Sequence, residues 1–305
     1  MDPILISIGP LAIRWYGLLI ALGVVAGSIW ALREARRREM NTEALLDMAP
    51  WLMIAGILGA RAVFVATSPG PFFGPGGNPW SALAIWQGGL SIHGAILGVM
   101  LAVLLLARRR GMRPWAVMDV LTPLGAFGII GGRIGNVMNG TDTGGRLTEL
   151  GIGVTWPEPG TETLGAFGRV VFGPELWQYG PPACQTVPAG EACVVHLTPI
   201  YGAVVGVLLI PILAWAFRRS TAPGFVFAHL AVWYSLLRSV LEEPFRDNPL
   251  AWPVFEHATA GIGLFTLTQL VSIPIVLIAV YALFTLDPDR DDRKGRLARR
   301  AANRR

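Results

Sequence analysis

Charged residues are scarce in this sequence. Asp, Glu, Lys and Arg make up 15% of its 305 residues, whereas 53% are hydrophobic and the mean hydropathy is +0.52. Lysine is nearly missing, with Lys294 as its single example. Too few polar residues remain to cover a water-soluble globule of this size. The composition excludes a soluble protein and predicts a protein of the lipid bilayer.

Motifs of several common enzyme classes are also missing. The sequence contains no HExxH zinc motif, no GxSxG nucleophile elbow and no GxxxxGK[ST] phosphate-binding loop. Its four histidines, His93, His196, His229 and His257, are far apart in the chain. We therefore expect neither a metal nor a cofactor. The N-terminus lacks a basic region and a small-residue cleavage site, so we expect no cleaved signal peptide.

Long hydrophobic runs, in contrast, are abundant. A helix that crosses a hydrocarbon core of about 30 Å needs about 20 apolar residues. Runs near this length occur at 12–32, 46–67, 90–107, 117–137, 198–217, 224–242 and 264–286. The sequence predicts an all-α polytopic membrane protein with seven transmembrane helices.

Basic residues follow alternate spans, which predicts the orientation. They are Arg33, Arg36, Arg37 and Arg38 after the first span, Arg108, Arg109, Arg110 and Arg113 after the third, Arg218 and Arg219 after the fifth, and the tail after the seventh. The connections 68–89 and 247–263 contain none. By the positive-inside rule the N-terminus is outside and the C-terminus cytoplasmic. The net charge of +5 would then face anionic lipid, and we expect no nucleic-acid binding.

The spans divide the chain into four predicted parts. Residues 1–137 carry spans one to four, 138–197 form an extracytoplasmic head, 198–286 carry spans five to seven, and 287–305 form a disordered basic tail. The head is rich in Gly and Pro and includes the β-like pieces "GIGVTW" and "RVVFG". Its two cysteines, Cys184 and Cys193, either close a disulfide or remain free.

Three arginines interrupt the apolar runs. Arg61 ends "GILGAR", Arg133 ends the similar "GIIGGR", and Arg238 lies in the sixth span. An arginine at the centre of a membrane helix costs roughly 2.5 to 3.5 kcal/mol, so three at similar depth indicate a shared anionic ligand. For Arg238 an ion pair with Glu242, four residues later, is the alternative. The glycines before Arg133 also form small-xxx-small pairs, which favour close helix packing.

The third span adds a titratable group, because "WQGGLSIHG" places His93 just inside its outer end. Together with the arginines, His93 predicts an outward-facing cationic cavity. Guanidinium groups bind phosphate bidentately, so a phospholipid suits such a cavity. Two other functions stay open. Ser91 beside His93 or with His196 would suit an intramembrane serine hydrolase, and a cationic site within the membrane would suit a transporter or flippase of an anionic lipid or metabolite.

Four motifs resemble those of one known family. "RWYG" at 14–17, "GGLSIHG" at 88–94, "GGRIGNVMNG" at 131–140 and R-x-x-x-E at 238–242 are similar to bacterial prolipoprotein diacylglyceryl transferases. The similarity extends from "SIGPLAIRWYGLL" near the start to "LTQLVSIPIVLIAVY" in the last span.

This resemblance implies an enzyme of the bacterial inner membrane. Such an enzyme transfers the diacylglyceryl group of phosphatidylglycerol to the lipobox cysteine in the signal peptide of a prolipoprotein, and glycerol phosphate leaves. The expected catalytic residues are His93, Arg133 and Arg238. The expected substrate-binding residues are Tyr16, Arg61, Asn136, Asn139, Asp142, Gly144, Glu242, Glu243 and Arg246.

The chain departs from the family pattern at three places. After Asn-Gly the family usually has a glutamate, whereas this chain has Thr141 and then Asp142, so the acidic role either moves to Asp142 or is missing. A family segment of the type "HPSQLYE" is here "HLTPIYG", so that Gly202 replaces an acid. The extra residue in "EEPFR" leaves open whether Glu242 or Glu243 takes the place of the family's glutamate.

Overall fold

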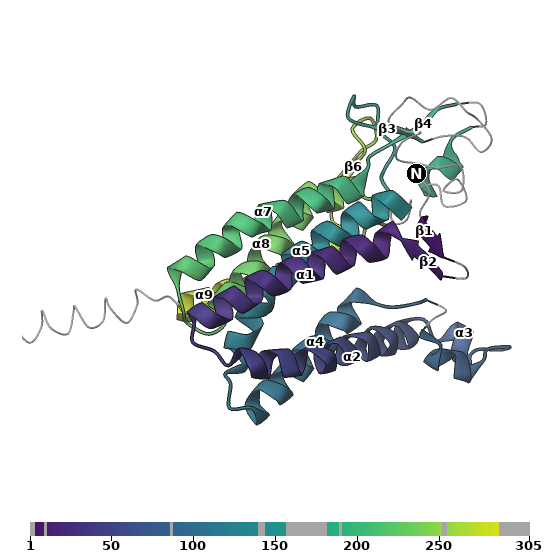
Figure 1. Ribbon diagram of the computed structural model, residues 1–305. Coiled ribbons are helices and arrows are strands. Elements are labelled where there is room, and N and C mark those ends of the chain that lie inside the picture. The colour runs from purple at the N-terminus through teal and green to yellow at the C-terminus, as the bar shows by residue number, and fades with distance from the viewer. Residues whose placement is uncertain are drawn as a thin grey trace, which may run out of the picture. The chain divides into compact units, whose positions relative to one another are not determined.

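The computed structural model describes residues 4–8, 11–85, 88–139, 144–156, 182–188, 191–251 and 255–286. Most of these residues are helical (Figure 1). Seven helices are long and apolar enough to cross a membrane: α1 (Trp15–Arg37), α2 (Thr42–Thr67), α4 (Ile92–Arg109), α5 (Pro114–Asn139), α7 (Thr198–Arg219), α8 (Phe225–Leu241) and α9 (Leu267–Leu286). The seven predicted spans are confirmed. The tail from residue 287 and the segment "RVVFG" lie outside the described residues.

The chain forms two compact units. The first unit comprises residues 1–31, 121–221 and 225–305, and the second comprises 32–120 and 222–224. Helices α1 and α5 each contribute to both units. The first unit thus contains most of α1 and α5 together with α7, α8 and α9.

In the first unit, glycines bring α1 and α5 close together. A methyl group at Gly131 would collide with the carbonyl oxygen of Leu19, and one at Gly135 would lie 2.8 Å from the ring of Tyr16. This glycine pair packs as the small-xxx-small pattern predicts. The other pair, Gly128 and Gly132, faces no atom of the described residues within 4 Å. Helix α8 packs against both α7 and α9.

In the second unit, α2 and α4 form an antiparallel pair. Gly59 and Gly94 meet where the helices cross, and a Cβ at either position would collide with the backbone of the other. Two short helices, α3 (Gly70–Phe73) and η1 (Pro79–Leu83), follow α2. The buried Asp119 accepts a hydrogen bond from the Gly224 amide at 2.9 Å and lies 3.4 Å from the Arg38 guanidinium.

The predicted head contains short strands between α5 and α7. Strand β3 (Val154–Trp156) pairs antiparallel with β4 (Cys193–Val195), and η4 (Pro182–Thr186) packs on β4. Cys184 and Cys193 form a disulfide, which resolves the alternative left open by the sequence. Two more antiparallel pairs, β1 (Ile4–Ile8) with β2 (Leu11–Arg14) and β5 (Glu256–His257) with β6 (Ile262–Gly263), belong to the same unit. In Figure 1 these strands lie at one end of α1, α5 and α7.

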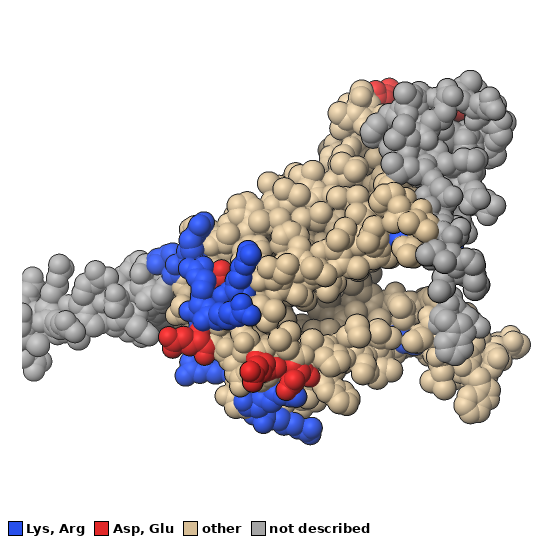
Figure 2. Space-filling view, in the orientation of Figure 1, with Lys and Arg blue, Asp and Glu red and all other residues tan. Residues whose placement is uncertain are grey.

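Basic side chains occupy the last turns of three helices. In the second unit they are Arg36 and Arg37 at the end of α1 and Arg108 and Arg109 at the end of α4, and Figure 2 shows basic side chains gathered at these ends. In the first unit, Arg218 and Arg219 occupy the last turn of α7, at the end far from the strands. The arginines that follow the first, third and fifth predicted spans thus lie in the last turns of α1, α4 and α7.

Candidate active site

Glu242 is the shared partner of three arginines. Its carboxylate lies 2.5 Å from Arg133 on α5, 3.2 Å from Arg246 and 3.7 Å from Arg238 on α8. The Glu242 side chain is 1% exposed. A carboxylate this deeply buried requires charged or hydrogen-bonding partners, and here the partners come from two helices and the segment after α8. The predicted pair of Arg238 with Glu242 is confirmed.

The next residue, Glu243, is buried as well and has a different set of partners. Arg238 lies 3.2 Å from its Oε2 atom. Its Oε1 atom accepts hydrogen bonds from the Asn248 amide at 2.8 Å and from the Thr266 hydroxyl at 2.9 Å. Arg238 thus bridges the two carboxylates.

We refer to Arg133, Arg238, Glu242, Glu243 and Arg246 as the arginine–glutamate cluster. The cluster brings three guanidinium groups together with two carboxylates. The sequence predicted a cationic cavity with Glu242 and Glu243 among its substrate-binding residues, and the binding of an anionic ligand by this cluster stays a prediction. The sequence pattern around Arg133 contains no nearby acid, and the missing anion is supplied by Glu242 from more than one hundred residues later in the chain.

The end of α8 is set by a proline. Pro244 has no amide hydrogen to continue the helix, so the chain turns into the short helix η5 (Glu243–Phe245) after Leu241. This turn allows Glu242 to contact α5, while its own amide still donates to the Arg238 carbonyl at 3.1 Å. The position of both carboxylates is thus a consequence of the local sequence "LEEPF".

A glycine makes room for the central ion pair. A methyl group at Gly202 on α7 would lie 2.7 Å from Nε of Arg133 and 2.8 Å from Oε2 of Glu242. Ordinary contacts of a Cβ atom begin at 3.4 Å. The backbone of α7 therefore packs directly against this pair, at the position where the family pattern has an acid.

The head segment after α5 approaches the cluster through its backbone. Gly145 pairs with Arg246 in an antiparallel bridge, and the Asp247 amide donates to the Gly144 carbonyl at 2.9 Å. Gly144, predicted to bind substrate, thus lies beside Arg246. The predicted residue Asp142 lies outside the described residues, as does the side chain of Asn139.

Two other predicted residues lie on helices of the same unit. Asn136 is half-buried on α5, three residues after Arg133, which puts both side chains on one helix face. Tyr16, at the start of α1, is 37% exposed, and its ring packs against Gly135. Tyr16 therefore belongs to the α1–α5 contact, whereas Asn136 shares the helix face of Arg133.

Arg61 lies in the second unit and binds carbonyl groups. Its guanidinium donates to the backbone oxygens of Ser81 at 2.5 Å, Ala82 at 2.8 Å, Gly88 at 2.5 Å and Gly89 at 3.0 Å. The rings of Phe64 and Phe72 lie 5.6 Å and 5.2 Å from its Cζ atom, a cation–π arrangement. Arg61 thus joins α2 to the loop that leads to α4.

His93 is an exposed residue in the first turn of α4. The amide of Ser91, the residue at the N-cap, donates to the Ala60 carbonyl on α2 at 3.0 Å. His93 therefore emerges from a rigid helix start, with the loop held by Arg61 directly before it. A general base must lie within hydrogen-bonding distance of the group that gives up the proton. The exposed side chain of His93 is accessible to such a group.

A second histidine, His196, which the sequence considered for the hydrolase alternative and which begins the segment "HLTPIYG", is fully buried in the head. His196 Nε2 lies 2.8 Å from the Ala260 carbonyl, and Nδ1 lies 2.9 Å from the Tyr201 hydroxyl. Because a carbonyl only accepts, Nε2 carries the hydrogen and Tyr201 donates to Nδ1. Burial lowers the pKa of His196, so its ring is held neutral.

No sequence motif indicated Asn248, Thr266 or the space at Gly202. Within the described ranges, no three metal-ligating side chains come together.

Known proteins match the chain over nearly its whole length. Residues 3–285 match the family model described as prolipoprotein diacylglyceryl transferase. Proteins named phosphatidylglycerol–prolipoprotein diacylglyceryl transferase are similar to it: that of Thermus thermophilus is 45% identical over 95% of this chain and 100% of its own length. The protein of Deinococcus radiodurans is 36% identical over 94% of this chain and 86% of its own length. The protein of a Thermoanaerobacter species is 32% identical over 92% of this chain and 92% of its own length. Family match, identity and seven spans together establish that the chain belongs to the prolipoprotein diacylglyceryl transferase family.

Proposed function

We propose that this protein transfers the diacylglyceryl group of phosphatidylglycerol to the lipobox cysteine of a prolipoprotein. One observation supports this function above all: a buried cluster of three arginines and two carboxylates at the end of membrane-spanning helices. The phosphodiester of phosphatidylglycerol carries one negative charge, and guanidinium groups such as those of Arg133 and Arg238 bind phosphate oxygens bidentately. Family membership supports the same reaction over lipid transport or hydrolysis.

The reaction is a substitution at carbon. The cysteine sulfur forms a bond to the glycerol carbon that carries the phosphoester oxygen, and the bond from this carbon to the oxygen breaks. The electron pair of that bond leaves with glycerol phosphate, and the thiol proton goes to a base. Negative charge therefore grows on the leaving phosphate as the reaction proceeds.

Arg133 and Arg238 stabilise this growing charge. Fixed positive groups in a site with little water lower the barrier for such a step by several kcal/mol, because they need no reorganisation. Glu242 and Glu243 hold the two guanidinium groups in place before substrate arrives. We assign the family's glutamate position to Glu242, because Glu242 contacts all three arginines of the cluster.

The other predicted residues bind and orient the substrates. His93 accepts the thiol proton, for which a histidine near neutral pKa is suited. Tyr16, Asn136 and Asn139 form hydrogen bonds with the lipid headgroup. Gly144 has no side chain, so the headgroup can come close to the backbone beside Arg246. Asp142 supplies the acid that the family has directly after Asn-Gly. For Arg61 we assign an indirect part, holding the loop before His93.

We infer the membrane orientation from the basic helix ends. The ends with Arg36, Arg37, Arg108, Arg109, Arg218 and Arg219 face the cytoplasm, and the head faces the outside. The cluster then lies near the outer surface of the bacterial inner membrane, where the signal peptide of an exported prolipoprotein presents its cysteine.

The experiment uses the purified protein in detergent with phosphatidylglycerol and a lipobox peptide. We expect release of glycerol phosphate and a diacylglyceryl mass gain on the peptide, with neither product from a Cys→Ser peptide. Arg133→Gln and Arg238→Gln abolish both products, whereas Arg37→Gln, whose side chain is 63% exposed, retains them. Binding of phosphatidylglycerol without either product would refute the transferase assignment and favour transport.

A further inference from the structure

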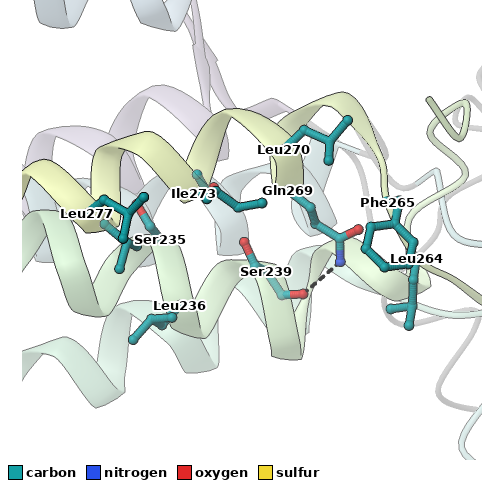
Figure 3. Close-up of a pocket in the computed structure, with 11 residues that line it drawn as sticks. Ser235, Leu236, Ser239, Leu264, Phe265, Gln269, Leu270, Ile273 and Leu277 are labelled. Carbon is teal, nitrogen blue, oxygen red and sulfur yellow. Dashed lines mark hydrogen bonds between the residues drawn. The ribbon is translucent and has the colours of Figure 1, made fainter. Parts of the chain in front are cut away.

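A groove of about 340 Å³ lies between α8 and α9 in the first unit (Figure 3). Its walls are mostly apolar: Leu236 contributes from α8, and Leu270, Ile273, Val276 and Leu277 contribute from α9. This volume is within the range of about 300 to 1,000 Å³ that is usual for small-molecule sites. The reaction assigned above places no residue in this groove.

One end of the groove is polar and leads to the arginine–glutamate cluster. The Gln269 amide donates to the Ser239 carbonyl at 2.9 Å, and its Oε1 atom accepts from the Thr266 amide at 3.0 Å. The Thr266 hydroxyl in turn donates to Glu243 at 2.9 Å. A continuous hydrogen-bonded path therefore connects the groove with the cluster.

The same end holds an unsatisfied hydroxyl. The Oγ atom of Ser239 is buried and has no hydrogen-bond partner among the residues that the structure describes. Leaving a buried polar group without a partner is unfavourable, so a ligand with an acceptor at this place would be stabilised. Figure 3 shows Ser239 and Gln269 facing each other across this end of the groove.

The other end of the groove is open at the apolar surface of α9, a helix apolar enough to cross a membrane. Ile273 is 53% and Leu277 64% exposed, and α9 as a whole buries little of its surface. From Gln269 to Leu277 the groove extends about 12 Å along α9, at a rise of about 1.5 Å per residue. A ligand that fits must therefore be polar at one end and a hydrocarbon over the rest of its length.

We propose that this groove binds one acyl chain of the phosphatidylglycerol substrate. The proposal rests on the proposed function, because it requires the phosphate to lie at the arginine–glutamate cluster. The ester carbonyl of the chain accepts a hydrogen bond from the Ser239 hydroxyl, and the hydrocarbon lies along Ile273 and Leu277. The substrate is favoured over bulk lipid because the polar end leads to three arginines, which bind an anionic headgroup better than a zwitterionic one.

The test maps where an acyl chain lies. Phosphatidylglycerol with a diazirine at the end of one acyl chain is photolysed with the full-length protein in nanodiscs, and the modified peptides are identified by mass spectrometry. We expect labelling of the α8 and α9 residues of the groove. Unlabelled phosphatidylglycerol should reduce this labelling, and the same amount of phosphatidylcholine should not. Labelling elsewhere, or equal competition by both lipids, would overturn the proposal.

A substitution that fills the groove gives a second measurement. Ile273→Trp should lower kcat/KM for long-chain phosphatidylglycerol about tenfold, because part of the chain loses its apolar contacts. Short-chain dihexanoyl phosphatidylglycerol should be affected less than about twofold. The matched control is Ile278→Trp, on a residue of α9 that is 70% exposed and does not line the groove. Equal losses with both substrates, or in both variants, would contradict the groove.

The outcomes separate this proposal from the assigned reaction. If wild-type protein transfers no diacylglyceryl group from either lipid, the proposed function fails and the groove proposal fails with it. If transfer occurs but the label maps to other helices, the function stands and the groove is refuted. The labelling map is measured on wild-type protein, so it decides the question even if Ile273→Trp does not fold.

Discussion

Replacing Gly202 by alanine tests whether α7 fixes the position of the central ion pair. The added methyl group would lie 2.7 Å from Nε of Arg133, whereas ordinary contacts begin at 3.4 Å. Arg133 and Glu242 must therefore move by about 0.7 Å, the difference between these two distances. Neither side chain is free to rotate away cheaply, because Glu242 is 1% exposed and also contacts Arg238 and Arg246.

This displacement should affect catalysis more than stability. Misplacing a catalytic group by about 1 Å costs about 100-fold in rate, so we expect a loss in kcat/KM of roughly this size. Overpacking by one methyl group should lower the free energy of unfolding by about 1 to 3 kcal/mol. The assay is glycerol phosphate release with phosphatidylglycerol and a lipobox peptide, together with thermal unfolding in detergent.

Two other glycines provide matched controls. Gly206→Ala, one helical turn further along α7, would place its methyl group 2.6 Å from Cγ1 of Ile130 and so disturbs α5 without touching the cluster. Gly128→Ala meets no described atom within 4 Å and should leave activity unchanged. Wild-type kcat/KM in Gly202→Ala would refute the reasoning. So would an equal loss in Gly206→Ala, because general packing of α5 on α7 would then explain both results.

Three further predictions concern buried polar groups. Glu242→Gln should abolish transfer and lower the free energy of unfolding by about 3 to 5 kcal/mol, because three arginines lose a shared anion. Wild-type thermal stability in detergent would contradict this. Arg61→Gln should increase protease cleavage of the loop between α2 and α4, because four carbonyl contacts are lost; an unchanged cleavage rate would refute its holding role. Burial lowers the pKa of His196 below its ordinary value of 6.5, so His196 binds a proton more weakly in the folded protein than in the unfolded chain. The free energy of unfolding should therefore decrease as the pH falls below about 6.5 and then level off beneath the folded-state pKa. This decrease should be smaller in His196→Gln when thermal unfolding is followed between about pH 5 and 8.

The sequence by itself determined the seven spans and their basic ends. Both follow from local properties, since the length of an apolar run and the position of arginines are read along one segment at a time. The pair of Arg238 with Glu242 was predictable for the same reason, because a spacing of four residues places two side chains on one face of a helix.

Only the tertiary structure decided which anion accompanies Arg133. Glu242 comes from another helix, and no local pattern reveals a contact between residues so far apart in the chain. The space at Gly202 and the hydrogen bonds of Glu243 to Asn248 and Thr266 depend in the same way on how α5, α7, α8 and α9 pack. The sequence alone shows which arginines and glutamates are available for a charged site in the membrane. Their pairing is a property of helix packing, because buried charges find partners in space and not along the chain.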